Sequence, residues 1–84
     1  MNTELLELLN RQLPVTVQHY KRKTVYQVIT VGTHTESHQR FVVYKAVSYP
    51  QDNQVWIRPI EEFCEIVEDD NGNKISRFTV LNIN

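Results

Sequence analysis

Trp56 and Arg58 place an aromatic ring and a guanidinium within the short segment Trp56-Ile57-Arg58-Pro59. Residues two apart in a β-strand point to the same face of a sheet. A guanidinium can bind a phosphate or a carboxylate through two parallel hydrogen bonds, so this pair could form an aromatic-floored pocket for an anion. The alternative is a structural ion pair, since an unpaired buried charge is costly. Candidate partners for Arg58 in such a pair are Glu36, Glu61 and Glu65.

A second group with potential chemistry is the basic segment His19-Tyr20-Lys21-Arg22-Lys23. Its mixture of aromatic and basic side chains can contact phosphates and stack bases, but it is equally typical of an exposed turn.

The charges are unevenly distributed along the chain. Residues 1–45 hold six Lys/Arg and three Asp/Glu (+3), whereas residues 46–84 hold three Lys/Arg and seven Asp/Glu (−4). This asymmetry argues against a dedicated non-specific nucleic-acid binder, which needs a broad basic field. It is compatible with a local basic patch, or with contact between oppositely charged parts of two copies.

Metal binding and catalysis have little support in the sequence. His34 and His38 have the i,i+4 spacing of helical zinc motifs, but they lie in a predicted turn, where that spacing has no such meaning. Cys64 could meet His19 or His34, but no nucleophile motif surrounds it. We therefore predict no metal site, no cofactor and no catalytic residues, and the sequence does not favour an enzyme.

The length of 84 residues predicts a single domain, 1–84, whose thin core needs extra apolar area. Leucines at helical spacing before Pro14 predict a short helix, with Asn2 or Thr3 as its cap. This segment, 1–13, could cap the open end of a barrel or serve as a dimerisation helix, and the need for core area favours the cap. The β-rich remainder spans 15–81.

Apolar and β-branched runs predict short antiparallel strands over 15–20, 25–31, 40–47, 54–58, 64–68 and 74–81. Residues 25–31 carry apolar side chains on both faces, which indicates a strand that is covered on both sides or that lies in a closed barrel with the helix outside. Ser48 to Asn53 is a predicted loop, Pro59 begins a predicted helical turn, and Asn71-Gly72 predicts a two-residue type I′ turn. The predicted fold is mostly β: a small SH3-like barrel or a rolled antiparallel sheet of five to six strands, with one short N-terminal helix.

Composition also indicates a setting. A single cysteine, Cys64, excludes an internal disulfide and favours the reducing cytoplasm. The N-terminal residues lack the basic region of a signal peptide, and no apolar run approaches the ~20 residues of a membrane-spanning helix. We therefore expect a cytoplasmic protein without a membrane partner.

Taken together and in order, several short motifs resemble the small bacterial family catalogued as domain of unknown function 1653. The matching motifs are His19-Tyr20-Lys21, Tyr26-Gln27-Val28, His34-Thr35-Glu36, Val42-Val43-Tyr44, Trp56-Ile57-Arg58-Pro59, Phe63 and Arg77-Phe78. The chain departs from the family pattern at Arg22, which is usually Gly, and at Glu62, which is usually Met. The resemblance implies a compact β-rich fold and no assigned activity.

Many of these motif positions are polar or charged, whereas a motif for packing alone would be mostly apolar. We therefore expect a non-enzymatic module that binds an anionic ligand, namely a nucleotide, a phosphate-bearing metabolite or an RNA segment. The expected ligand-binding residues are His19, Lys21, Glu36, Tyr44, Trp56, Arg58 and Arg77. The alternative is an interaction or accessory module that meets a protein partner, or a second copy, through a sheet edge or the N-terminal helix.

Overall fold

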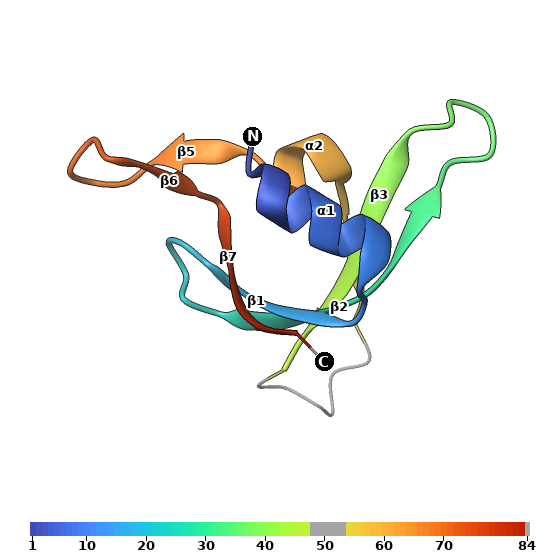
Figure 1. Cartoon of the computed structure of the whole chain (residues 1–84), viewed down its shortest axis with the longest axis horizontal. Coiled ribbons are helices and arrows are strands. Elements are labelled where there is room, and N and C mark those ends of the chain that lie inside the picture. The colour runs from blue at the N-terminus through green and yellow to red at the C-terminus, as the bar shows by residue number, and fades with distance from the viewer. Residues whose placement is uncertain (48–53, 84) are drawn as a thin grey trace.

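A computed structural model describes residues 1–47 and 54–83, in which strands hold far more residues than helices. The helices are α1 (Thr3–Arg11) and α2 (Ile60–Phe63). The strands are β1 (Val15–His19), β2 (Val25–Thr33), β3 (Arg40–Ala46), β4 (Trp56–Pro59), β5 (Ile66–Glu68), β6 (Lys74–Ser76) and β7 (Phe78–Ile83). Five of them form an antiparallel sheet in the order β4-β3-β2-β1-β7, and β5 and β6 form a separate hairpin (Figure 1). The predicted mostly β fold with a short N-terminal helix is confirmed.

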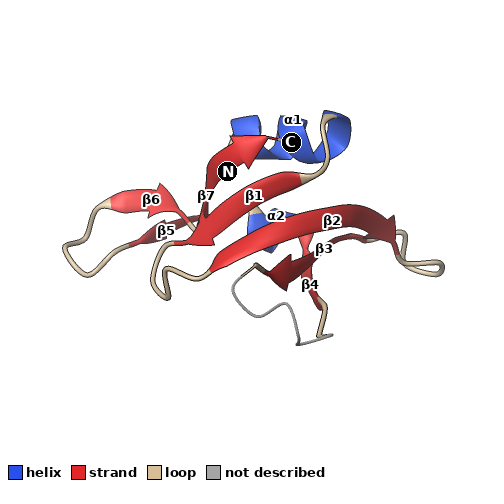
Figure 2. Cartoon of the chain, turned by 90° about the horizontal axis from the view of Figure 1, so that it is seen from below, coloured by secondary structure: helices blue, strands red, loops and turns tan. Residues whose placement is uncertain are grey.

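Of the two predicted forms, the rolled sheet fits the described residues. The strand order ends at β4 on one side and at β7 on the other, so the described strands do not close into a barrel. The predicted last strand, 74–81, is divided at Arg77: β6 pairs with β5, whereas β7 leaves to pair with β1. The strands curve around the two helices in the view of Figure 1, and Figure 2 shows the same sheet from below.

The strand register defines one inner face of the sheet, the face on which the helices pack. Val15 of β1 lies opposite Val28 of β2, which lies opposite Tyr44 of β3, which lies opposite Trp56 of β4. Directly paired residues project from the same side of a sheet. The first three of these side chains are buried in the core, whereas Trp56 is exposed. The inner face therefore continues past the core at β4.

The helix α1 closes part of this core. Its Leu5 and Leu9 are buried with Val15, Val28 and Phe63 in one apolar cluster. A helix of nine residues is not stable alone, so this packing is what holds it in place. Since both leucines are buried within the chain, they are not free to contact a second copy.

Asn2 fixes the start of α1. Its Oδ1 accepts a hydrogen bond from the Leu5 amide at 3.1 Å, and its Nδ2 donates to the Ser76 hydroxyl at 2.9 Å. The Asn2 amide also donates to the Cys64 carbonyl at 2.7 Å. Asn2 therefore joins the helix to the β6 hairpin as well as capping it.

We expect Asn2→Ala to lower the free energy of unfolding by about 1 kcal/mol, the usual cost of losing an N-cap side chain. Urea unfolding followed by circular dichroism measures this loss. Asn10→Ala, at an exposed position on the same helix, serves as the control and should change stability far less. Equal stability of wild type and Asn2→Ala would contradict the capping role.

The prediction that residues 25–31 are covered on both sides is wrong. A register shift lies between Val28 and Thr30, so Ile29 is an extra residue on β2. Such a β-bulge reverses the alternation of side chains beyond it. Val28 and Val31 therefore both pack toward the inner face, while Ile29 points away and is exposed.

The predicted type I′ turn at Asn71-Gly72 is also wrong. Gly72 has φ 80°, but Asn71 is not among the residues with positive φ, and a type I′ turn needs positive φ at both positions. Instead the Asp69 amide donates to the Asn73 carbonyl, and the Asp69 carboxylate accepts from the amides of Asn71 and Asn73 at 2.9 Å each. The carboxylate thus stabilises a longer loop.

The predicted loop Ser48–Asn53 lies outside the described residues. Among the residues that are described, no helix is long and apolar enough to span a bilayer.

Candidate functional site

A pocket of about 400 Å³ lies on the inner face of the sheet, beyond the part that the helices cover. It is lined by His19, Lys21, Arg22, Tyr26, Tyr44, Trp56, Arg58, Arg77 and Phe78. The structure therefore brings six of the seven expected binding residues together, and Glu36 is the exception. The lining combines aromatic rings with four cationic side chains and contains no carboxylate.

Phe78 and Tyr44 form the floor of this pocket, and both are buried. The Phe78 ring stacks on Phe63 of α2, with centroids 4.0 Å apart and planes 10° apart. Tyr44 meets Phe63, Phe78 and Tyr26 edge to face, with centroids 5.1 to 5.8 Å apart. Offset-stacked and edge-to-face pairs are favourable beyond their buried area, so these ring contacts stabilise the floor.

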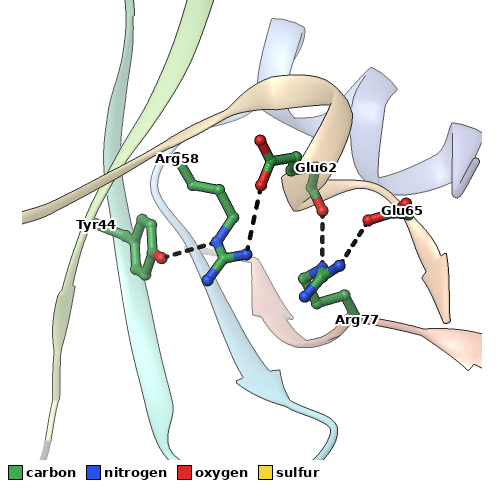
Figure 3. A network of polar contacts seen from close by, with 5 residues as sticks. All are labelled: Tyr44, Arg58, Glu62, Glu65 and Arg77. Carbon is green, nitrogen blue, oxygen red and sulfur yellow. Dashed lines mark hydrogen bonds and ion pairs between the residues drawn. The ribbon is translucent and has the colours of Figure 1, made fainter.

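Arg58 enters the pocket from β4, on the same face as Trp56. Its guanidinium carbon lies 6.0 Å from the centre of the Phe78 ring, and its Nε donates to the Tyr44 hydroxyl at 3.4 Å. Its ion-pair partner is Glu62, with Nη1 and Oε1 3.9 Å apart (Figure 3). The predicted partners Glu36, Glu61 and Glu65 are thus wrong, because α2 begins directly after Pro59 and places Glu62 four residues along.

This ion pair is weak enough to leave the Arg58 guanidinium available to a ligand. The side chain of Arg58 is 30% exposed and that of Glu62 is 56% exposed, and 3.9 Å is long for a charged pair. Exposed pairs of this kind contribute about 0–1 kcal/mol. An anion in the pocket can therefore compete for the guanidinium.

Arg77 is held more firmly. Its Nη2 lies 2.6 Å from Oε1 of Glu65, and its Nε donates to the Glu62 carbonyl at 3.0 Å (Figure 3). Glu62 thus faces Arg58 with its carboxylate and binds Arg77 with its main chain. Arg77 lines the pocket, but its main contacts tie the start of β7 to α2 and the segment that follows it.

Lys21 and Arg22 reach the pocket from the turn between β1 and β2. In this turn the Nδ1 atom of His19 accepts hydrogen bonds from the amides of Lys21 and Arg22, at 3.2 Å each. The Lys23 amide donates to the His19 carbonyl, and Lys23 adopts φ 60°. Neither Lys21 nor Arg22 forms an ion pair within the described part of the chain. The turn therefore fixes the backbone beneath two cations, of which Lys21 also lines a second hollow together with Asp69 and Asp70.

His19 is neutral in this arrangement, since a ring nitrogen that accepts hydrogen bonds carries no proton. Burial lowers the pKa of His19 below its ordinary value of 6.5, and the positive charges of Arg58, Arg22 and Arg77 lower it further. The positive charges of the three guanidinium groups that line the pocket therefore act on His19 at its edge. The pocket is electropositive even though the whole chain carries a net charge of −1.

Acidification is expected to destabilise the folded chain through His19. Because its folded-state pKa is lowered, the neutral ring contributes stability that is present above pH 6.5 and is lost as the pH falls through the folded-state pKa. Urea unfolding at pH 7.5 and pH 5.5 measures this effect. His19→Gln should reduce the difference between the two pH values, whereas His38→Asn should leave it in place. An identical pH dependence in wild type and His19→Gln would refute the role of His19.

Glu36 does not line the pocket. It lies in the exposed turn between β2 and β3. This turn repeats the pattern of the first one. His34 Nδ1 accepts from the amides of Glu36 and Ser37, the His38 amide donates to the His34 carbonyl, and His38 has φ 61°. His34 therefore acts as a turn residue, and no group of three potential metal ligands occurs among the described residues.

Cys64 does not line the pocket. It is a buried free thiol, and burial, together with the charge of Glu61, raises the pKa of Cys64 to about 11. The nucleophilic thiolate form is therefore disfavoured near neutral pH.

Three lining residues were absent from the expected set: Arg22, Tyr26 and Phe78. Tyr26 precedes the core residue Val28 by two positions, so strand alternation alone places it on the inner face. His19 lies opposite Phe78 in the pairing of β1 with β7, which only the fold reveals. Arg22 follows the expected residue Lys21 in the basic segment, and the turn places both side chains at the same pocket.

A rolled antiparallel sheet with an open cationic and aromatic pocket defines the structural class of this protein. Residues 16–80 match the model of a family described as protein of unknown function (DUF1653). This match covers most of the chain, and the chain belongs to that family. No curated protein and no solved structure matches the chain.

Proposed function

We propose that this protein is a binding module for an anionic ligand, a nucleotide, a phosphate-bearing metabolite or an RNA segment, which it holds in the pocket on the inner face. The observation that carries the proposal is the composition of the lining: four cations, an aromatic floor and no carboxylate. Charge-assisted hydrogen bonds from Arg and Lys are the usual way in which proteins bind phosphate and carboxylate groups.

Within this module Lys21, Arg22 and Arg58 supply the charge. Lys21 and Arg22 have no internal ion pair among the described residues, and Arg58 has only a long, exposed one. Arg77 contributes positive potential while its hydrogen bonds remain with Glu62 and Glu65. A volume of about 400 Å³ suits a small ligand, since typical ligand pockets measure roughly 300–1,000 Å³.

A thermal-shift screen tests this function. The probes are inorganic phosphate, pyrophosphate, sugar phosphates, nucleotides and short single-stranded oligonucleotides. A ligand at 100 times its Kd adds about 2.7 kcal/mol of stability, which for a domain of this size raises Tm by roughly 10 °C or more. We expect at least one probe to do so, with a shift that shrinks as salt is added.

Arg58→Ala provides the site-specific arm of this test. Hydrogen bonds to charged groups contribute about 1.5–3 kcal/mol, so the affinity for the anion should fall at least tenfold. Arg40→Ala removes the same kind of side chain at an exposed position outside the pocket, and it should bind as the wild type does. Equal ligand response in wild type and Arg58→Ala, measured by calorimetric titration, would refute the proposal.

A second candidate function rests on the outer edge of β4, which pairs with no other strand in the described part of the chain. This strand ends the sheet, and its Ile57 points away from the pocket and is 65% exposed. A strand at the edge of a sheet, with an exposed apolar residue, can receive a strand from another chain. If β4 is such an interaction surface, Ile57→Lys should abolish a dimer or complex observed by light scattering, and a wild-type chain that is monomeric at all concentrations would argue against a homodimer.

We place this module in a reducing compartment such as the cytoplasm. Its only cysteine, Cys64, is a free, buried thiol. Proteins of oxidising compartments typically carry disulfides, whereas free thiols are typical of reducing ones. A fusion to a fluorescent protein, observed in cells, tests this expectation.

A further inference from the structure

Trp56 has an exposure that packing does not explain. It is 45% exposed although it lies on the inner face, opposite the buried Tyr44. The other aromatic residues that line the pocket, His19, Tyr26, Tyr44 and Phe78, all contact other rings. Trp56 makes no ring contact among the described residues. Its position at the pocket, rather than on an outer face, offers a flat aromatic surface to whatever enters.

From this feature we infer the class of ligand, which rests on the proposed anion-binding function. We propose that the pocket binds a nucleotide, with its base stacked on Trp56 and its phosphate held by Lys21 and Arg22. Each half of the site matches one half of such a molecule. Aromatic side chains stack on every base, because every base has a π-face.

The two halves come from separate elements that the fold holds in place. Trp56 begins β4 and is fixed by its pairing with Tyr44 in β3. Lys21 and Arg22 lie in the turn that follows β1, and the His19 ring anchors the backbone of that turn. All three side chains line the same pocket. A molecule that carries an aromatic group and an anionic group therefore complements both elements at once.

Other occupants of an exposed tryptophan fit this pocket less well. A cationic group can also lie over an indole ring. Here the lining holds Lys21, Arg22, Arg58 and Arg77 and no carboxylate, and among the described residues only the two arginines Arg58 and Arg77 pair with carboxylates beside it, so the charge of the pocket disfavours a cation. A sugar phosphate would satisfy the cations, but its ring has no π-face and would contact the indole only through C–H groups. A nucleotide satisfies both, and about 400 Å³ is a suitable volume for one.

The chain provides its own probe, because Trp56 is its only tryptophan. AMP, GMP, CMP and UMP are each titrated while Trp56 fluorescence is followed, and ribose 5-phosphate is the matched ligand without a base. We expect at least one nucleotide to quench the fluorescence and to bind about tenfold or more tightly than ribose 5-phosphate. A single-stranded trinucleotide distinguishes the two sources of this chemistry: tighter binding than the mononucleotide indicates a strand, and equal binding indicates a free nucleotide.

Variants connect this advantage to the indole ring. In calorimetric titrations Trp56→Leu should reduce the affinity for the nucleotide to that for ribose 5-phosphate, and Trp56→Phe should retain most of the difference. Ile57→Ala, its neighbour on the opposite face, is the control and should bind as the wild type does. If no nucleotide exceeds ribose 5-phosphate, or if Trp56→Leu keeps the difference, the nucleotide inference is wrong.

These outcomes separate the inference from the function on which it rests. Ribose 5-phosphate that binds equally well as the nucleotides, and is lost in Arg58→Ala, would overturn the nucleotide inference and keep the anion-binding module. The absence of binding by every phosphate compound would overturn both.

Discussion

Replacing Phe78 with alanine is expected to lower the free energy of unfolding by about 3–5 kcal/mol, the usual cost of removing a buried Phe ring. Phe78 is 1% exposed, and its ring stacks on Phe63 and contacts Tyr44, Tyr26 and His19. A domain of 84 residues has a total stability of about 4–13 kcal/mol. The variant should therefore unfold at much lower urea concentration, or be unfolded at room temperature.

Urea unfolding followed by circular dichroism measures this loss. Phe41→Ala is the matched control: Phe41 is only partly buried and is outside the core cluster, so its loss should cost clearly less. A Phe78→Leu variant keeps much of the apolar volume and should restore part of the stability. Equal losses in Phe78→Ala and Phe41→Ala would show that the aromatic floor is not the centre of this core.

The double change Lys21→Glu/Arg22→Glu is expected to weaken anion binding by more than about a hundredfold. It removes two charge-assisted contacts, each of about 1.5–3 kcal/mol, and replaces them with repulsion. The fold should be retained, because both side chains are exposed and only their backbone amides bind His19. Calorimetric titration with pyrophosphate measures the binding, and circular dichroism checks the fold.

A control with the same change in charge isolates the pocket from the net charge of the chain. Arg40→Glu/Lys45→Glu also moves the net charge from −1 to −5, at two exposed positions of β3 that do not line the pocket. It should retain most of the affinity. If both double variants lose binding to the same extent, the attraction is a property of the whole chain, and the pocket assignment is contradicted.

Most of the fold could be predicted from local sequence patterns. The helix before Pro14 and the β-branched runs specify their own secondary structure, since apolar spacing and proline act over a few residues. The bulge at Ile29 could not be predicted, because an extra residue in a strand becomes visible only when its partner strand is in register. The turn at Asn71 failed for a related reason: the carboxylate of Asp69 stabilises a longer loop than the Asn-Gly pair indicates.

The candidate site was predictable in part. Strand alternation places Trp56 and Arg58 on one face, and the motif resemblance added the other residues of the expected set. The pairing of Arg58 with Glu62 depends on where α2 begins, and the place of Phe78 depends on the pairing of two strands far apart in the sequence. Glu36 was grouped with the site by its motif, but its turn lies at the opposite end of β2 from the basic turn.

The most direct test of the binding proposal is a two-dimensional NMR titration of the isotopically labelled chain with the tightest phosphate ligand from the screen. The account predicts that the largest shift changes occur at the backbone amides of Lys21 and Arg22, at the indole N–H of Trp56 and at the side chain of Arg58. Saturating changes confined to residues outside the pocket, such as the exposed turn over residues 34–38, would contradict it.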